Sequence, residues 1–482
     1  MQTYLYLYLS SAFVAIIITP IVIKFAMNIK AVDRPGVRTV HKRPVPRIGG
    51  TAIFISFMFV IVIVMFMSNE ISEAFRNMQK PLTVLFCSAT LIFIVGFFDD
   101  LKGLPAKFKF LTEIISASAL CFAGVKITSI SITDQAVLNL GILSCPLSIL
   151  WIVGITNAVN LSDGLDGLAA GISAVAFGVI LVLAIYNDQV IMAVIMLIML
   201  GSLTGFLFFN FNPAKIFLGD CGSLFLGFMI RSLSILCSMK SSALVGLALP
   251  VLTLGVPIFD TFFSMLRRFL ERRSIFSPDR NHFHHKLIDL GIKQRHVVIT
   301  IYVITLLVTG LGMFMMVTRD INTLVIFFCI LLLLFLVFHV VGSVRLRETI
   351  AGLQRKYTIT RQIKHEKKHY EDAELYFRRA VTFNQWWDAI GETAQRLNFA
   401  WISLKTKNED CTISTNIWRT ADKQVDFSKL IIINIPHNNN DDFSYEFEIA
   451  VSFNGSYESA GHRVTLFARL LDEYNINSNN DK

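Results

Sequence analysis

The sequence contains few charged residues for its length. Of its 482 residues, 44 are Lys or Arg and 35 are Asp or Glu, so only 16% are charged, whereas soluble domains have about 25%. Hydrophobic residues make up 54% of the chain, and the mean hydropathy is +0.58. This composition excludes an ordinary soluble enzyme. Many apolar runs reach the roughly 17 residues that a membrane helix needs, which is typical of a protein that crosses the membrane repeatedly.

Two other sequence patterns are missing. The cysteines at 87, 121, 145, 221, 237, 329 and 411 form no CxxC pair and no disulfide framework, so we expect no role for them. No internal repeat is visible either. The net charge of +9 does not indicate a nucleic-acid partner, because the basic residues lie mostly in loops between apolar runs. Membrane topology and anionic phosphate ligands explain them better.

The apolar runs predict about 11 transmembrane helices, near 4–27, 50–67, 82–98, 110–125, 141–159, 168–186, 190–209, 216–237, 243–266, 297–317 and 321–343. The first run is too long for a signal peptide and lacks a basic n-region, so it should remain as a membrane helix. Basic residues fill the connections after the first and the ninth run. By the positive-inside rule, the N-terminus lies outside, and the basic loops and the C-terminus lie in the cytoplasm.

Polar side chains gather at the end of the fifth run, in NAVNLSDGLDG (157–167). Asn157, Asn160 and Asp163 share one helix face by their spacing of three, and Asp166 follows. Amides and carboxylates at the end of a membrane helix are costly unless they bind something. A capped helix end with a polar turn is the simpler alternative. Further acidic sites and a histidine cluster on the same side of the membrane favour a binding site.

Asp99 and Asp100 directly follow the third run. Adjacent carboxylates repel each other unless a cation or a proton intervenes, which suits a metal-assisted phosphoryl site or a general base. The alternative is a solvated pair at the membrane interface. Lys107, one of three lysines that follow, is expected to bind substrate.

Asp220 lies between two glycines of a third polar segment, so a metal ion or a diphosphate can approach its carboxylate closely. Phe217 is a candidate for stacking on a base, although packing is the commoner role of phenylalanine.

Asp260, in the ninth run, is either a functional carboxylate or the partner of a basic neighbour. The loop beyond it offers a diphosphate cradle of arginine and imidazoles, namely Arg280, His282, His284 and His285. Zinc is not expected, because no cysteine or further histidine accompanies them.

The composition changes near residue 345. Residues 345–395 are charged and should be helical, with a basic start suited to an anionic inner leaflet. The runs WISLKT, LIIINI and YEFEIAVSF predict strands between about 397 and 455, and a helix is expected near 458–474. The predicted fold is thus an all-α polytopic membrane domain (1–344) followed by a small C-terminal cytoplasmic α+β domain (345–482), in which we find no catalytic constellation.

Five motifs, in this order, resemble those of the polyprenyl-phosphate N-acetylhexosamine-1-phosphate transferase superfamily, which bacterial nomenclature calls glycosyltransferase family 4. They are PRIGG (46–50), FFDDLKG (97–103), NAVNLSDGLDGLAAG (157–171), FNPAKIFLGDCGSL (211–224) and SPDRNHFHH (277–285). The histidine segment resembles the branch that transfers N-acetylglucosamine phosphate. The muramoyl-pentapeptide translocase branch instead carries three consecutive histidines after a proline. The region beyond 345 lies outside the resemblance.

The resemblance implies transfer of a sugar 1-phosphate from a UDP-sugar to undecaprenyl phosphate in the bacterial inner membrane, with release of UMP. It implies that Asp220 and Asn160 bind Mg²⁺, with Mn²⁺ as the alternative metal. It also implies that Asp99 is a base acting on the lipid phosphate, with Asp100 beside it, and that Asp163 is another essential carboxylate. The remaining implied contacts are with the nucleotide (Asp166, Asn210 and Phe217) and with the diphosphate and sugar (Arg280, His282, His284 and His285). Dimers are common in the superfamily, but no stripe of residues here identifies a homodimer interface.

Several alternatives stay open at this point. The donor could be another UDP-N-acetylhexosamine, or the chain could be a muramoyl-pentapeptide-type translocase. A transporter or flippase would carry coupling ions on its carboxylates near the bilayer midplane, whereas these carboxylates cluster at helix ends. A membrane anchor for a C-terminal sensor or partner-binding module would leave the acidic motifs of the membrane part unexplained.

Overall fold

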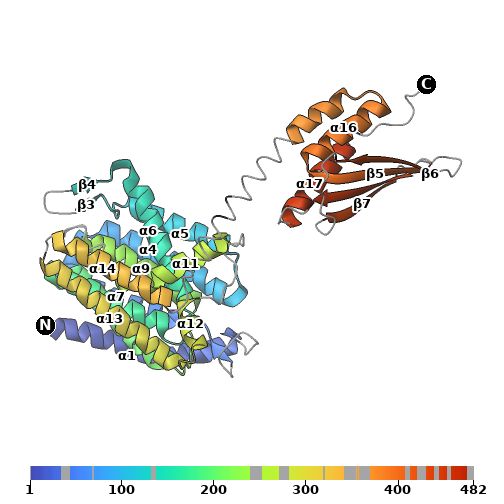
Figure 1. The fold of residues 1–482 in the computed structure, drawn as a ribbon. Helices are drawn as coiled ribbons and strands as arrows, with labels where there is room; N and C mark the ends of the chain where they lie inside the picture. Colours follow the sequence, from blue (N-terminus) through green and yellow to red (C-terminus); the bar gives the residue numbers. More distant parts are fainter. Residues whose placement is uncertain are drawn as a thin grey trace. The chain divides into compact units, whose positions relative to one another are not determined.

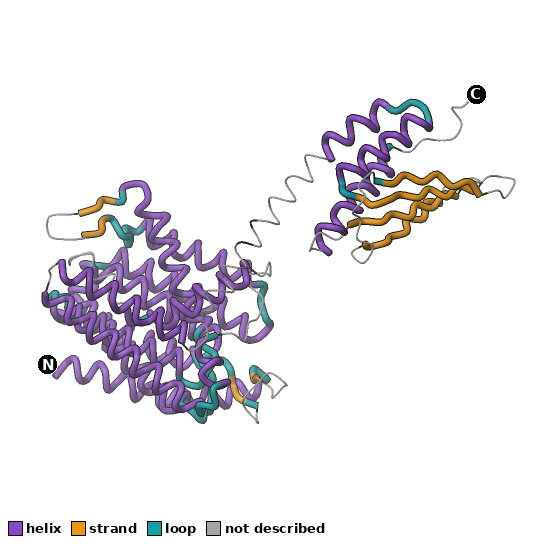
Figure 2. The backbone as a smooth tube through the Cα atoms, in the orientation of Figure 1, coloured by secondary structure: helices purple, strands orange, loops and turns teal. Residues whose placement is uncertain are grey.

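The computed structural model describes residues 2–33, 44–67, 70–131, 137–238, 252–270, 282–318, 321–340, 354, 357, 370–407, 413–420, 430–438, 444–452 and 457–474. The chain divides into two compact units, residues 1–346 and 347–482. The first unit is a bundle of helices, and the second combines a sheet with helices (Figures 1 and 2).

The described helices of the first unit are α1 (Gln2–Asn28), α2 (Gly50–Phe66), α3 (Glu70–Asn77), α4 (Gln79–Lys102), α5 (Ala106–Phe122), α6 (Ser144–Leu161), α7 (Leu168–Tyr186), α8 (Val190–Asn210), α9 (Gly219–Ser238), α11 (Gly255–Leu270), α12 (Phe283–Asp289), α13 (Gln294–Thr318) and α14 (Ile321–Val340). Two short antiparallel strand pairs lie between them, β1 (Val32–Asp33) with β2 (Val45–Pro46) and β3 (Ser129–Ser131) with β4 (Val137–Asn139). A 3-10 turn, η1 (Gly141–Leu143), precedes α6.

Seven helices of the described chain are long and apolar enough to cross a membrane, namely α1, α4, α6, α7, α8, α9 and α13. The bent pair of α2 and α3 gives an eighth if it forms one span. The predicted membrane protein is therefore confirmed, but the predicted count of about 11 is not. The predicted span at 110–125 corresponds to α5, which has 17 residues and contains the buried Glu113. The predicted spans at 243–266 and 321–343 extend into residues outside the described ranges.

Helix α9 lies at the centre of the bundle. All its side chains from Cys221 to Cys237 are buried, and it packs against α2, α4, α6 and α7. Small residues permit this packing: a Cβ atom on Gly227 would lie 2.8 Å from the Cα of Thr156 in α6. Because these four helices surround α9, they fix the position of its N-terminal end relative to their own ends.

A disulfide joins Cys121, at the end of α5, to Cys145, at the start of α6. The expectation that no cysteine has a role was wrong for this pair. The two residues are 24 positions apart and carry no spacing signal, so only the antiparallel packing of α5 and α6 brings them together.

The second unit contains a four-stranded antiparallel sheet with the strand order β6-β5-β8-β7. Its elements are α16 (Phe383–Arg396), β5 (Phe399–Lys407), β6 (Ile413–Arg419), β7 (Leu430–Asn438), β8 (Ser444–Ser452) and α17 (Tyr457–Glu473). Apolar side chains of β5 and β8, such as Ile402 and Phe447, share one core with Trp386 of α16 and Phe467 of α17. The structure therefore agrees with the predicted strands and the predicted final helix.

Candidate active site

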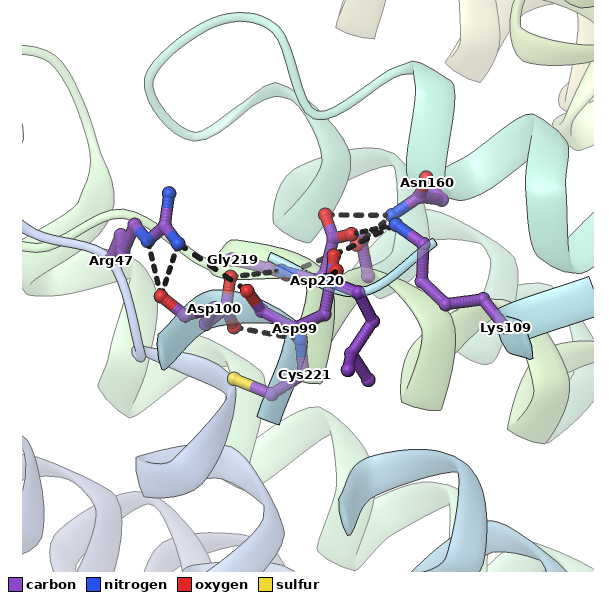
Figure 3. A network of polar contacts seen from close by, with 10 residues as sticks. Arg47, Asp99, Asp100, Lys109, Asn160, Gly219, Asp220 and Cys221 are labelled. Atoms are coloured by element: carbon purple, nitrogen blue, oxygen red, sulfur yellow. Dashed lines mark hydrogen bonds and ion pairs between the residues drawn. The ribbon is translucent and has the colours of Figure 1, made fainter. Parts of the chain in front are cut away.

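The C-terminal end of α4 and the N-terminal end of α9 meet in one cluster of polar side chains (Figure 3). Asp99 and Asp100 lie in the last turn of α4, and Asp220 lies in the first turn of α9. The Nζ of Lys109, from α5, lies 2.8 Å from the Oδ2 of Asp99 and 2.6 Å from the Oδ2 of Asp220. One ammonium group thus bridges two carboxylates that come from different helices.

Asn160, at the end of α6, binds the other oxygen of Asp220. Its Nδ2 donates to the Oδ1 of Asp220 at 3.1 Å and to the Oγ of Ser223 at 2.8 Å. Asp99 also accepts a hydrogen bond from the backbone N–H of Leu104. Asp99, Asn160 and Asp220, which belong to three separate sequence motifs, therefore lie in one network.

Asp100 binds backbone groups instead of side chains. Asp100 is only 6% exposed. Its two carboxylate oxygens accept hydrogen bonds from the backbone N–H groups of Asp220 and Cys221, each at 3.0 Å. The first N–H groups of a helix have no partner within the helix, and a negative charge there also interacts favourably with the helix dipole. The structure places Asp100 beside Asp99, as the sequence predicts, with its carboxylate capping α9.

Lys109 and Glu113 were not among the predicted site residues. Lys107, the lysine that the sequence favours, is exposed on α5 and makes no hydrogen bond or ion pair with the described residues, so its role stays a prediction. Glu113 is 2% exposed and accepts a hydrogen bond from the Nδ2 of Asn157. The available signal was the spacing of four between Lys109 and Glu113, which places both on one face of a helix within an apolar run.

The loop between α6 and α7 brings two more predicted carboxylates to this region. Asp163 lies against the backbone of Gly219, next to Asp220. Burial, together with the nearby charges of Asp220 and Asp100, raises the pKa of Asp163 well above its ordinary value. Asp163 therefore lies beside the start of α9, and its role as an essential carboxylate stays a prediction.

Asp166 lies in the same loop but binds the segment that follows α8. Its Oδ2 accepts hydrogen bonds from the Nδ2 of Asn212 at 2.9 Å and from the N–H of Ala214 at 3.0 Å. Asn210, which is 2% exposed, donates from its Nδ2 to the carbonyl of Ile216 at 2.8 Å. Both predicted nucleotide ligands therefore hold the same loop in place, and their contacts with a nucleotide stay predictions.

Phe217 ends this loop with a half-buried side chain. Its N–H donates to the carbonyl of Pro46 at 2.7 Å, and its carbonyl accepts the N–H of Gly49 at 2.9 Å. The backbone of Phe217 thus joins two of the sequence motifs, and the stacking role of its ring stays a prediction.

Asp260 of α11 binds the histidine segment. Its Oδ1 accepts the N–H of Phe283 at 2.8 Å, and its Oδ2 lies 3.1 Å from the Nδ1 of His282 and 3.7 Å from the Nδ1 of His284. The ring of His285 lies 4.5 Å from that of His284, measured between centroids. Asp260 is therefore a partner of the histidines, one of the two readings that the sequence left open. Arg280 lies outside the described residues.

His284 is buried, with 3% exposure, and packs against Gly164 of the loop between α6 and α7. Burial lowers the pKa of His284 to about 3, although the nearby charge of Asp260 opposes this effect. At neutral pH this imidazole is uncharged, so it offers hydrogen bonding instead of positive charge to a phosphate.

The donor set at the cluster suits Mg²⁺ better than a metal that needs many protein ligands. The described residues include no group of three or more His, Cys, Asp and Glu side chains that could hold a metal ion. Mg²⁺ commonly takes one or two carboxylates and completes its shell with water and substrate phosphates. Asp99 and Asp220, which share one ammonium, fit this description. Asn160 directs its amide nitrogen at Asp220 here, so it orients that carboxylate, and a direct ligand would have to present its Oδ1.

Comparison with known proteins identifies related chains. A model of glycosyl transferase family 4 matches residues 82–238, which contain the cluster formed by α4, α5, α6 and α9. A probable undecaprenyl-phosphate N-acetylglucosaminyl 1-phosphate transferase of Bacillus subtilis is 42% identical over 300 residues, which cover 62% of this chain and 80% of that protein.

Two other relatives differ in their named substrates. A decaprenyl-phosphate N-acetylglucosaminephosphotransferase of Mycobacterium leprae is 31% identical over 318 residues, which cover 61% of this chain and 79% of that protein. A phospho-N-acetylmuramoyl-pentapeptide-transferase of Listeria innocua is 34% identical over 281 residues, which cover 54% of this chain and 84% of that protein. The family model ends at residue 238, and each of these relatives leaves more than a third of this chain outside the similarity.

Proposed function

Because this chain belongs to glycosyl transferase family 4, we propose that it transfers a sugar 1-phosphate from a UDP-sugar to undecaprenyl phosphate. The products are undecaprenyl-diphospho-sugar and UMP, and the reaction starts the synthesis of a cell-surface polysaccharide. The sugar we propose is N-acetylglucosamine, because the relatives from Bacillus subtilis and Mycobacterium leprae carry it in their names. The histidine segment supports this choice, since His282 and His284 are separated by Phe283 and form no run of three.

The observation that carries the proposal is the cluster of Asp99, Lys109, Asn160 and Asp220. Both substrates are anionic, so the site must neutralise charge while it holds the two phosphates in line. The cluster supplies one cation, Lys109, and two carboxylates that could hold a divalent metal ion, from three helix ends. The cluster lies at the ends of apolar helices, so a lipid substrate and the cluster belong to the same membrane.

The reaction requires one bond exchange at phosphorus. An oxygen of undecaprenyl phosphate attacks the phosphorus that carries the sugar, and the bond to UMP breaks, with the electron pair leaving on UMP. The second pKa of a phosphate monoester is about 6, so the lipid phosphate is already largely dianionic at neutral pH. We therefore favour direct attack over a covalent enzyme intermediate. Little proton transfer is then needed, so Asp99, which Lys109 keeps ionised, would mainly orient the attacking group.

We propose Mg²⁺, with Mn²⁺ as the alternative, as the cofactor at Asp220 and Asp99, with Asn160 holding Asp220. When bound, it would neutralise the diphosphate and so favour attack by another anion. Asp99, Lys109 and Asp220 would then orient the metal ion and the diphosphate. His284, which is neutral, would donate or accept a hydrogen bond.

The disulfide supports a cytoplasmic site. Cys121 lies twelve residues beyond Lys109 in α5, about 18 Å along the helix, so it is at the opposite end of α5 from the cluster. Disulfides persist in oxidising compartments outside the cytoplasm. This agrees with the expectation that the apolar run at 110–125 crosses the membrane, and it supports the topology expected from the basic loops. In that topology the N-terminus lies outside, and the cluster and the C-terminal unit lie in the cytoplasm of a bacterial inner-membrane protein.

The test is UMP release by the purified full-length protein with undecaprenyl phosphate, Mg²⁺ and a panel of UDP-sugars. We expect release that needs the lipid, the metal and UDP-N-acetylglucosamine, and that is lost in Asp220→Ala. Release with a different UDP-sugar would change the donor and keep the reaction. No release from any donor by folded protein would contradict the proposal and favour transport.

Removal of residues 345–482 separates this function from an anchor that serves the C-terminal unit. The cluster lies entirely in the first unit, so the truncated protein should retain substantial UMP release. Loss of all activity in a folded, membrane-inserted truncation would contradict this expectation.

A further inference from the structure

Arg47, from the PRIGG motif, binds the end of α4. Its Nε donates to the carbonyl oxygen of Asp100 at 2.6 Å, and its Nη2 donates to the same oxygen and, at 3.4 Å, to the carbonyl of Asp99. The last carbonyls of a helix have no partner within the helix and form the negative end of its dipole, so a guanidinium there is both a cap and a favourable charge. Arg47 thus holds the backbone of the two adjacent aspartates.

The backbone beside Arg47 is joined to the segment that leads into α9. The N–H of Gly49 donates to the carbonyl of Phe217 at 2.9 Å, and the N–H of Gly50 donates to the carbonyl of Leu218 at 2.7 Å. The side chain of Arg47 and its neighbouring backbone therefore contact opposite partners, the end of α4 on one side and the start of α9 on the other.

Asp100 makes the reverse connection, from α4 to α9, through its two hydrogen bonds with the N–H groups of Asp220 and Cys221. Gly219 allows the backbone of Arg47 and the carboxylate of Asp100 to approach the start of α9. Its φ is +74°, and a Cβ atom there would collide with the carbonyl of Arg47 and lie 2.6 Å from the Oδ2 of Asp100. We call the side chains of Arg47 and Asp100, with Gly219 between them, the Arg47–Asp100 clamp (Figure 3).

We propose that Arg47 and Asp100 are positioning residues, which hold the end of α4 against the start of α9 so that the carboxylates of Asp99 and Asp220 can share Lys109. This inference deepens the proposed function and rests on it. The guanidinium of Arg47 is engaged by two carbonyls, and both oxygens of Asp100 are engaged by N–H groups. The two adjacent aspartates therefore have different roles. Asp99 acts at the reacting groups, whereas Asp100 positions Asp220 by binding the backbone at the start of α9.

UMP release by full-length Arg47→Ala, Arg47→Lys and Asp100→Asn tests this proposal, with Lys102→Gln as the control. Lys102 is an exposed cation in the same last turn of α4, so its loss removes a charge from that helix end without breaking the clamp. We expect kcat to fall about 10- to 100-fold in Arg47→Ala and Asp100→Asn, with KM for the UDP-sugar changed by less than about threefold. Arg47→Lys should recover part of the loss, because one ammonium cannot reproduce the fork of the guanidinium.

Chemical rescue provides a readout that a loss of folding would not give. Guanidinium chloride at non-denaturing concentrations should restore part of the activity of Arg47→Ala, whereas matched sodium chloride should not, and Asp100→Asn should not respond. Activity of Arg47→Ala equal to that of Lys102→Gln would overturn the proposal. A higher KM at unchanged kcat would also overturn it, because Arg47 would then bind substrate. Loss of activity that follows the unfolded fraction, without rescue, would overturn it as well.

Thermal unfolding separates failure of the clamp from failure of the proposed function. If the wild type and Lys102→Gln release no UMP from any donor, the proposed function fails, and the clamp is judged from stability alone. The double variant of Arg47→Ala and Asp100→Asn should then lose less stability than the sum of the single variants, because both act on one joint. Additive losses would show that the two side chains do not act together.

Discussion

The Nζ of Lys109 lies 2.6 Å from the Oδ2 of Asp220, although 111 residues separate them in the sequence. The same ammonium also binds Asp99 at 2.8 Å. Hydrogen bonds between charged groups at such distances are about twice as strong as neutral ones. Lys109 therefore reduces the repulsion between two neighbouring carboxylates, which makes it a candidate site residue together with them.

Replacing Lys109 should impair catalysis more than folding. Lys109→Gln leaves Asp99 and Asp220 without the cation that they share, and it removes positive charge from the place where the diphosphate must bind. We expect kcat for UMP release to fall about 100- to 1000-fold, as for other groups that stabilise charge in a transition state. Kinetics at saturating substrates, together with thermal unfolding, measure the two effects.

Lys107→Gln provides the comparison, because Lys107 is two residues away on α5 and exposed. The structure predicts a much smaller loss for Lys107→Gln than for Lys109→Gln. A larger loss at Lys107 would show that the sequence-based choice of lysine was right and that the ion pairs of Lys109 are structural.

Gly219 should not tolerate a side chain. Its φ of +74° is a left-handed conformation, which costs an L-residue about 1–2 kcal/mol, and its Cβ would also collide with the carbonyl of Arg47. Gly219→Ala should therefore lower both the midpoint of thermal unfolding and kcat. Gly154→Ala is the matched control, because a Cβ at Gly154 in α6 would meet no atom within 4 Å. Equal stability of the two variants would contradict this account of Gly219.

The sequence predicts much of the site because its polar motifs fall at the ends of apolar runs. If all these ends lie on one side of the membrane, Asp99, Asn160 and Asp220 must be near one another. Their partners are harder to predict, because a pairing depends on which helices are neighbours. Lys109 and Glu113 lie inside a run that reads as a membrane span, and only the packing of α5 against α4 and α6 shows their partners.

The number of spans shows a similar limit. The length rule predicts a span at 110–125, and α5, with 17 residues and the buried Glu113, is shorter than the seven clear spans. It does predict the seven long helices, whose apolar residues are continuous. The division of labour between Asp99 and Asp100 is likewise invisible in the sequence, because adjacent residues of one type point in different directions on a helix.

Acid should destabilise the protein through His284. Its pKa in the folded protein is about 3, below the ordinary value of 6.5, chiefly because it is buried. The unfolded chain then binds the extra proton, so the contribution of His284 to stability is complete above pH 6.5 and is lost as the pH falls from 6.5 toward 3. The slope for one such group is at most about 1.4 kcal/mol per pH unit.

Thermal unfolding between pH 7.5 and pH 5 measures this effect. His284→Gln should flatten the pH dependence, whereas His296→Gln, which replaces an exposed histidine near the start of α13, should leave it unchanged. An unchanged slope in His284→Gln would show that the acid sensitivity arises elsewhere.

The disulfide between Cys121 and Cys145 allows the topology to be tested in intact cells. If it faces the exterior, a membrane-impermeant maleimide should label these cysteines only after treatment with an impermeant reductant. The assay needs a background in which the other five cysteines, at 87, 221, 237, 329 and 411, are replaced by serine. Labelling without a reductant would contradict the disulfide, and labelling that requires a permeant reductant and a permeant maleimide would place this end in the cytoplasm.

Loss of the disulfide should lower stability more than it lowers activity. It ties α5, which carries Lys109 and Glu113, to α6, which carries Asn157 and Asn160, and it closes a loop with a sequence separation of 24 residues. The double variant Cys121→Ala/Cys145→Ala should lose about 2–4 kcal/mol of stability. Because the ion pairs of Lys109 and the hydrogen bond between Asn157 and Glu113 remain, kcat at a temperature well below unfolding should change much less than in Lys109→Gln. A fall in kcat as large as that of Lys109→Gln would mean that the outer ends of α5 and α6, and not the contacts within the cluster, determine where Lys109 lies.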